Sequence, residues 1–329
     1  MLRGGLLVRA HPMITPDESV HTLLLATLQR FVAADAQIVA STSIPLQGGM
    51  SGSAVARHTI QYMTARGAST IALITKDADR HEWRVLQHLQ SQQQPNIPFA
   101  YSIDTLHGER LQICLQDVGD QNRPTSLDPI TETELAREAA GLAAIHAANF
   151  QPQPALDWLP AMRPSYIHDM LFVRAWRPAW ERAVADPHFA TTFWETIPRI
   201  EAAAATIVAD MQALLNEPAA QTLIHADLNP SNVLVDHGQP YFVDWQTAMR
   251  GPFYIDLPHH HCTLTQAEHY RQALAAHGHR VSRQDFAERY RVAARYIGLR
   301  YMWWTLDYWR EDPTQTPWVQ HYLDLVTGE

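Results

Sequence analysis

The chain has 329 residues, of which 46% are hydrophobic and 18% charged, a composition typical of a globular protein with a full core. At about 150 residues per domain, this length fits two domains better than one. The formal net charge of −9 argues against a nucleic acid partner, because binding phosphates requires a basic face. A cationic substrate is only loosely indicated, since many soluble proteins are equally acidic.

The cysteines and the first residues of the chain predict no metal, disulfide or membrane role. Cys114 and Cys262 are far apart in the sequence, and neither belongs to a CxxC pair. Residues 1–13 hold only a short apolar patch, whereas a secretory signal needs about 7–15 apolar residues and a membrane span about 20. We therefore expect a cytoplasmic protein with no membrane partner. The sequence leaves the oligomeric state open.

The first predicted element is a helix over residues 16–32. Thr15 and Glu18 form a capping box, and Pro16 stands at the first helical position. The apolar residues that follow repeat at helical spacing and give the helix one apolar face. This pattern indicates a packing helix.

From residue 38 to about residue 118 the pattern changes to strands. A glycine-rich turn is expected at 47–53, a third strand over 70–76, and a buried strand over 111–115. A short helix that contains Glu82 follows the third strand. Strands followed by helices are typical of an α+β lobe.

Beyond Gly119 the chain becomes mostly helical. Thr131 and Glu134 form a second capping box, and Ser282 with Asp285 repeats the same kind of start signal. Further helices are predicted over 166–185, 189–215 and 282–309, with a short β segment over 223–245 between the second and the third.

The strongest chemical pattern lies in this β segment. It reads His225-x-Asp227-x-x-x-x-Asn232, and Asp244 follows twelve residues after Asn232. Phosphoryl transfer needs a carboxylate beside the attacking hydroxyl and oxygen ligands that hold Mg²⁺ on the phosphates. A hairpin between Asn232 and Asp244 would return Asp244 to the other two, so the three polar groups are expected to meet.

This pattern resembles the catalytic loop and the magnesium aspartate of the aminoglycoside phosphotransferase-like family. That family includes choline, homoserine and methylthioribose kinases and belongs to the protein-kinase-like superfamily. The resemblance implies that Asp227 is the catalytic base or hydroxyl-orienting residue and that His225 is structural. It also implies that Asn232 and Asp244 are the magnesium ligands. A polar β-hairpin with an Asn-Pro turn is the alternative, but it leaves the many matched positions unexplained.

Earlier residues supply the parts that bind ATP phosphates in that family. Gly49 and Ser51 belong to a glycine-rich turn whose backbone can approach phosphates, although such a run by itself is more often a hairpin turn. Lys76 is the only lysine of the chain, and its compact ammonium can reach the α- and β-phosphates. A solvent-facing lysine is the alternative. Glu82 is the natural partner of Lys76, but its separation is shorter than usual in the superfamily, so their pairing stays open.

Two further segments resemble parts of the same family. Gln116 and Val118 follow the buried strand at the place of the hinge, where backbone groups hold adenine; an ordinary strand-ending turn is the alternative. Residues 251–257 resemble the segment that follows the magnesium aspartate. There Asp256 is expected to be a helix cap or a loop brace rather than a catalyst.

Two conspicuous features remain open to two interpretations. His259, His260 and His261 look like a metal cluster, but adjacent residues point in different directions and no partner stands at ligand spacing. The aromatic residues over 301–309 are either helix core or a cage for an ammonium group. The alternative ligands for amino groups are the nearby acids Asp169, Glu181, Asp307 and Glu311.

Together these patterns predict an α+β protein-kinase-like bilobal fold, with a β-rich N-lobe over 1–118, a mainly helical C-lobe over 119–329, and ATP between them. The expected function is ATP- and Mg²⁺-dependent transfer of phosphate to a hydroxyl of a small molecule such as an aminoglycoside, an amino alcohol or a sugar. One alternative is a non-catalytic nucleotide-binding regulator. A protein kinase is disfavoured because no Ala-Pro-Glu segment or long activation loop follows Asp244.

Overall fold

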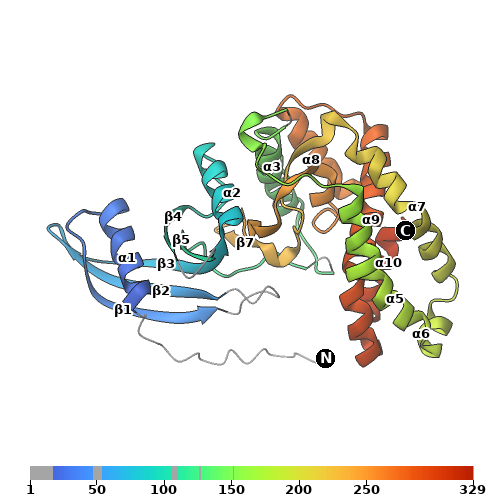
Figure 1. Ribbon diagram of the computed structural model, residues 1–329, viewed down its shortest axis with the longest axis horizontal. Helices are drawn as coiled ribbons and strands as arrows, with labels where there is room; N and C mark the ends of the chain where they lie inside the picture. The colour runs from blue at the N-terminus through green and yellow to red at the C-terminus, as the bar shows by residue number, and fades with distance from the viewer. Residues whose placement is uncertain (1–17, 47–53, 106–109, 126, 151, 329) are drawn as a thin grey trace. The chain divides into compact units, whose positions relative to one another are not determined.

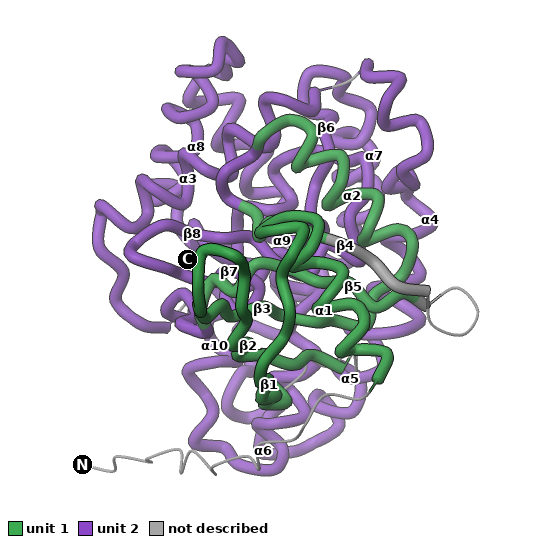
Figure 2. Tube along the Cα trace, turned by 90° about the vertical axis from the view of Figure 1, so that its left-hand side faces the viewer, with its two compact units in different colours: residues 1–93, 97–119 green, residues 94–96, 120–329 purple. Residues whose placement is uncertain are grey.

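The structure is a computed structural model that describes residues 18–46, 54–105, 110–125, 127–150 and 152–328. Its described residues form two compact units, which are coloured separately in Figure 2. The first unit contains the described residues up to 93 together with 97–119, and the second contains 94–96 and the described residues from 120 onward.

The first unit is a five-stranded antiparallel sheet with two helices, α1 (Glu18–Phe31) and α2 (Arg80–Ser91), packed against it (Figure 1). Its strands are β1 (Gln37–Leu46), β2 (Val55–Thr64), β3 (Gly67–Asp79), β4 (Ala100–Thr105) and β5 (Arg110–Gln116), in the order β1-β2-β3-β5-β4. Gly67 closes the hairpin between β2 and β3 at φ 114°, a conformation that side chains rarely adopt.

The core of this unit forms where the apolar face of α1 meets the sheet. Leu24 and Leu28 of α1 are fully buried, and they belong to one cluster with Ile60, Leu73 and Cys114 from three strands. This is the face that the helical spacing of the sequence predicted. Burial raises the pKa of the Cys114 thiol to about 11, and both Cys114 and Cys262 are free thiols.

The second unit is mostly helical and carries two small two-stranded sheets, β6–β9 and β7–β8. Its strands are β6 (Gln221–Ile224), β7 (Val233–Asp236), β8 (Gln239–Phe242) and β9 (Met249–Pro252). Its α-helices are α3 (Glu132–Ala147), α4 (Pro164–His168), α5 (Trp176–Val184), α6 (Pro187–Thr192), α7 (Ile197–Leu215), α8 (Leu264–Ala276), α9 (Arg283–Glu311) and α10 (Thr316–Thr327).

Helix α9 is the centre of this unit, since it packs against α5, α7 and α10 (Figure 1). Gly298 permits the close approach of α10: a Cβ at this position would lie 2.6 Å from a methyl of Val326 and 3.0 Å from the carbonyl oxygen of Tyr322. Ser282 caps α9 as the sequence predicted, because its side chain accepts a hydrogen bond from the backbone N–H of Asp285.

The structure corrects several predicted boundaries. The helix expected over 166–185 is three pieces, α4, the π-helix η2 (Asp169–Arg174) and α5, and the helix expected over 189–215 is interrupted between α6 and α7. Pro198 stands in the first turn of α7, where a proline is tolerated, but it could not continue a helix arriving from α6. Of the predicted start of the first helix, Thr15, the capping-box partner of Glu18, and Pro16 lie outside the described residues.

The architecture confirms the predicted α+β class, with a β-rich first unit and a mostly helical second unit. The capping box of Thr131 and Glu134 is present in full at the start of α3. Over the described part of the chain, no helix has the length and apolar character required to cross a membrane.

Candidate active site

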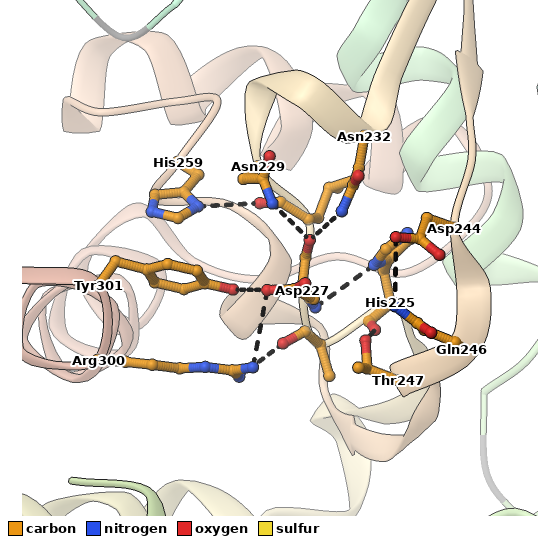
Figure 3. A network of polar contacts seen from close by, with 12 residues as sticks. His225, Asp227, Asn229, Asn232, Asp244, Gln246, Thr247, His259, Arg300 and Tyr301 are labelled. Atoms are coloured by element: carbon orange, nitrogen blue, oxygen red, sulfur yellow. Dashed lines mark hydrogen bonds and ion pairs between the residues drawn. The ribbon is translucent and has the colours of Figure 1, made fainter. Parts of the chain in front are cut away.

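The predicted catalytic residues of the second unit lie on the loop that follows β6 (Figure 3). After residues 225–229 the chain makes the short turn η4 (Pro230–Asn232) and enters the hairpin β7–β8. The backbone N–H of Val243 then donates to the carbonyl oxygen of Asn232 at 2.9 Å, which returns the chain to the loop. Asp244 follows at once, so the hairpin brings Asn232 and Asp244 together as its length suggested.

Two residues of this region, Ala226 and Asp244, adopt left-handed backbone conformations with φ of 64° and 66°. Residues other than glycine enter this region at an energetic cost, so the surrounding contacts must hold them there. Asp256 supplies one such contact: its carboxylate accepts the backbone N–H of His225 at 2.6 Å and that of Ala226 at 2.9 Å. Asp256 is therefore a brace of the loop and not the cap of a helix.

The Asp256 carboxylate is itself fully buried against His146, with 3.3 Å between Oδ2 and Nε2. Burial by itself would raise the pKa of this carboxyl, but its hydrogen bond with His146 and the nearby His225 lower it below its usual range. The brace thus stays ionised, and an ionised carboxylate accepts stronger hydrogen bonds from backbone N–H groups.

His225 occupies a structural position beneath the loop. Its Nε2 lies 2.8 Å from the carbonyl oxygen of Val243, and its ring packs against Trp245 with 4.7 Å between centroids. Thr247 donates to the carbonyl oxygen of His225 at 2.9 Å. Because the side chain is buried among these contacts, it joins the loop to the segment after β8 rather than facing a substrate.

The side-chain amides of Asn232 and Asn229 both bond to the backbone carbonyl oxygen of Asp227. Asn232 donates from Nδ2 to the carbonyl oxygen of Asp227 at 2.8 Å, and Asn229 does so at 3.2 Å. With Nδ2 of Asn232 used in this way, Oδ1 is the acceptor atom of the amide. The carboxylate of Asp244 contacts Nε2 of Gln246 at 3.4 Å (Figure 3).

The first unit contains the ion pair that the sequence left open. Lys76, near the end of β3, lies with Nζ 2.7 Å from Oε1 of Glu82, and their side chains are 10% and 3% exposed. The short separation is sufficient because α2 begins directly after β3. Asp79 caps that helix by accepting the backbone N–H of Glu82 at 2.7 Å, which places Glu82 in the first turn, above the strand end.

Comparison with known families gives a match that spans these residues. The model of the phosphotransferase enzyme family matches residues 70–294, a segment that contains Lys76, Glu82, Asp227, Asn232 and Asp244. The chain belongs to this family. The enzyme class predicted from the sequence, a small-molecule kinase, is thereby confirmed.

Solved structures agree on the fold. A spectinomycin phosphotransferase in complex with ADP and spectinomycin is 13% identical and superposes with a TM-score of 0.56, with 93% of each chain covered. Its AMP-bound complex covers 82% of this chain and 90% of its own, at the same identity and TM-score. A Ralstonia eutropha protein provisionally named an aminoglycoside phosphotransferase is 11% identical, with a TM-score of 0.54 over 92% of this chain and 95% of its own. A comparison with curated protein sequences gives no match.

The remaining nucleotide-binding residues expected for this phosphotransferase lie in the first unit. Gln116 ends β5, and its backbone N–H donates to the carbonyl oxygen of Phe99 at 2.8 Å. Val118 is buried, and Gly119 follows it with φ of 80°. Gly49 and Ser51 lie outside the described residues.

Sequence reasoning missed the contacts that α9 makes with the loop of this phosphotransferase. The Tyr301 hydroxyl donates a hydrogen bond to Oδ1 of Asp227, and Nη2 of Arg300 lies 3.8 Å from the same oxygen. Arg300 also donates from Nη1 to the carbonyl oxygen of Ala226 at 2.6 Å. The arginine is buried, and a buried guanidinium requires partners, but helical spacing by itself could not say which ones.

The other aromatic residues over 301–309 differ in their burial. Trp309 is buried, the Trp304 ring packs against Trp318 of α10 at 5.5 Å between centroids, and Tyr308 is 56% exposed. Of the two interpretations that the sequence allowed, core packing therefore applies to Trp309 and not to the whole segment.

Two of the three adjacent histidines have separate side-chain partners. His259 contacts the carbonyl oxygen of Leu228 through Nδ1 at 3.2 Å, and His260 lies 2.7 Å from Oε1 of Glu138. In the ranges that the structure describes, no group of three or more His, Cys, Asp or Glu side chains is arranged to hold a metal ion.

Proposed function

We propose that this phosphotransferase transfers the γ-phosphate of ATP, with Mg²⁺, to a hydroxyl group of a small molecule, in the cytoplasm where ATP is available. The observation that carries the proposal is the loop of the second unit, where Asp227, Asn232 and Asp244 are brought together by the turn η4 and the hairpin β7–β8. A carboxylate beside two oxygen ligands is the set of groups that phosphoryl transfer requires.

Asn232 and Asp244 fit a magnesium ion by the chemistry of their donor atoms. Mg²⁺ prefers oxygen ligands, and the pair offers a carboxylate and an amide oxygen. The hydrogen bond from Nδ2 of Asn232 to the carbonyl oxygen of Asp227 supports this role, because it engages the amide nitrogen and leaves the amide oxygen as the acceptor. When bound, the ion would neutralise charge that develops on the β- and γ-phosphates.

Asp227 is proposed to receive the hydrogen bond of the acceptor hydroxyl and to orient that oxygen for in-line attack on the γ-phosphorus. The bond from the γ-phosphorus to the bridging oxygen then breaks, ADP leaves, and the carboxylate holds the proton of the acceptor. With 29% of its side chain exposed, Asp227 is accessible to a small molecule. The brace from Asp256 keeps the loop in place without taking part in the reaction.

The nucleotide is proposed to use residues of the predicted N-lobe over 1–118. Lys76, oriented by Glu82, would contact the α- and β-phosphates, with Gly49 and Ser51 near the phosphates as well. The backbone at Gln116 and Val118 would hold adenine. The spectinomycin phosphotransferase structures that contain ADP or AMP support nucleotide binding by this fold.

The acceptor is proposed to bind to the predicted C-lobe over 119–329. It is proposed to be an aminoglycoside, an amino alcohol or a sugar-like molecule. The spectinomycin bound by the similar phosphotransferase makes such compounds the first to test. Two of the acids considered as ligands for amino groups already face arginines: Oδ2 of Asp169 lies 2.5 Å from Nε of Arg174, and Oδ1 of Asp307 lies 3.0 Å from Nη2 of Arg182. Uncharged sugars therefore belong in the panel beside amino compounds.

The test is ADP release from Mg-ATP across a panel of aminoglycosides, amino alcohols, sugars and nucleosides, with Asp227→Ala as the control. We expect acceptor-dependent turnover in the wild type that Asp227→Ala abolishes. Mg-ATP should also raise the melting temperature of both proteins, because Asp227 is not proposed to bind the nucleotide. Turnover that survives in Asp227→Ala, or the absence of any Mg-ATP effect on either quantity, would contradict the proposal.

A further inference from the structure

The side chain of Asp227 uses its two oxygens differently. Oδ1 accepts the hydrogen bond from Tyr301 and faces Arg300 at 3.8 Å. Within the described ranges, no hydrogen bond or ion pair reaches Oδ2. One oxygen of the proposed catalytic carboxylate is thus held by the protein, while the other is available to an acceptor hydroxyl.

The groups that hold this loop come from two neighbouring places in the second unit (Figure 3). Arg300 donates to the carbonyl oxygen of Ala226 at 2.6 Å, Tyr301 donates to Asp227, and His259 contacts the carbonyl oxygen of Leu228 at 3.2 Å. Each of the three consecutive loop residues 226–228 therefore has a contact of its own with one of these groups. The rings of His259 and Tyr301 also pack together, with 4.0 Å between their centroids.

The Tyr301 hydroxyl is expected to stay protonated, so that it can always donate a hydrogen bond. Burial raises the pKa of its hydroxyl well above the usual range; Arg300 lowers it, but the adjacent Asp227 carboxylate raises it further. The hydroxyl consequently stays protonated and donates to the carboxylate. Its helix, α9, is packed on three other helices, so the donor is presented from a rigid element.

We propose that Tyr301 is a positioning residue of the phosphotransfer reaction. It fixes the rotation of the Asp227 carboxylate so that Oδ2 is presented to the acceptor hydroxyl. This inference rests on the proposed role of Asp227. Without the Tyr301 hydroxyl the carboxylate can rotate about its Cβ–Cγ bond, and fewer of the bound acceptor molecules are aligned for attack.

The test compares Tyr301→Phe with Tyr290→Phe. Tyr290 lies on the same helix, is buried, and donates one hydrogen bond to the carbonyl oxygen of His261. Each variant loses a single hydroxyl that donates a hydrogen bond, but Tyr290 does not contact the loop residues 225–229 through any hydrogen bond. ADP release from Mg-ATP is measured with water as the acceptor, and then with the panel compound that gives the highest turnover.

We expect Tyr301→Phe to lower kcat by about 10- to 100-fold, with the KM of the acceptor changed by less than about two-fold. The Mg-ATP-induced rise in melting temperature should be that of the wild type. Tyr290→Phe should lower the melting temperature to a similar extent as Tyr301→Phe, yet retain kcat. This split between kcat and KM is not expected if the hydroxyl only supports the fold.

Three outcomes would overturn the inference while leaving the kinase activity itself established. The first is a kcat of Tyr301→Phe equal to that of the wild type. The second is a lower acceptor KM or a higher kcat/KM in the variant, which would mean that the tyrosine competes with the acceptor for Asp227. The third is a phosphate on Tyr301 after incubation with Mg-ATP, found by mass spectrometry, which would make this hydroxyl an acceptor. If the wild type shows no turnover, the proposed function fails first.

Discussion

The ion pair of Lys76 and Glu82 has a structural role beside the role that we propose for it in phosphate binding. Both are largely removed from water, so each charge depends on the other within the first unit. Breaking a buried ion pair by removing one partner leaves the remaining charge uncompensated, whereas replacing both partners with neutral groups avoids that penalty. The two roles can therefore be separated by mutation.

We expect Lys76→Met to lower the free energy of unfolding by about 3–5 kcal/mol, because the buried Glu82 carboxylate loses the opposite charge of the Lys76 ammonium. The double variant Lys76→Met/Glu82→Gln should recover most of this stability in urea denaturation. Neither variant should show the Mg-ATP-induced rise in melting temperature of the wild type. A double variant that binds Mg-ATP as the wild type does would exclude Lys76 as a phosphate ligand.

At the scale of elements, helix α3 has a capping box at its start and, near its end, a contact with Asp256, the brace of the loop. Its first turn carries the capping box of Thr131 and Glu134, and its last turn carries His146, which contacts Asp256. The cap satisfies backbone N–H groups that have no partner inside the helix. Its loss should weaken the helix end far from the loop and leave the contact of His146 intact.

Thr131→Ala is expected to lower the free energy of unfolding by about 1 kcal/mol, the usual contribution of such a cap. The matched control is Thr133→Ala, the same substitution at an exposed position inside the helix. Urea denaturation of the two variants measures the difference, and ADP release should be unchanged in both. Equal stability of the two variants would show that the cap contributes nothing measurable.

At the scale of the whole molecule, buried histidines tie stability to pH. Burial lowers the pKa of His321 to about 4, and the same cause lowers that of His261 to about 3. In the unfolded chain a histidine titrates near 6.5. Between pH 6.5 and 4 the unfolded state therefore binds protons that the folded state does not, and stability must fall as the pH falls through this window.

Each of these two histidines is expected to remove about 2 kcal/mol from the free energy of unfolding between pH 7 and pH 5. Urea denaturation at several pH values measures this loss of stability. His321→Gln is expected to remove about half of the loss that the two histidines cause together. His277→Gln, a change at an exposed histidine of the second unit, serves as the control. If His321→Gln keeps the full pH dependence, His321 is not buried in its neutral form.

Much of this protein follows from short stretches of its sequence. The spacing of Asp227, Asn232 and Asp244 predicted their meeting, because a single turn and a single hairpin determine it. The helix start at Thr131 and the α+β class are likewise local, since capping and the alternation of apolar residues are properties of neighbours in the chain. A local pattern is also sufficient to nominate Lys76, the only lysine.

The tertiary structure decided the contacts between distant segments. The contact of Tyr301 with Asp227, 74 residues earlier in the chain, is the clearest example. Helical spacing shows which face of α9 is buried, but only the packing of that helix in the second unit determines which side chain meets Asp227. The sequence by itself determined which chemical groups the loop carries. The tertiary structure decided which distant residues hold the loop in place, because those contacts depend on packing rather than on proximity in the chain.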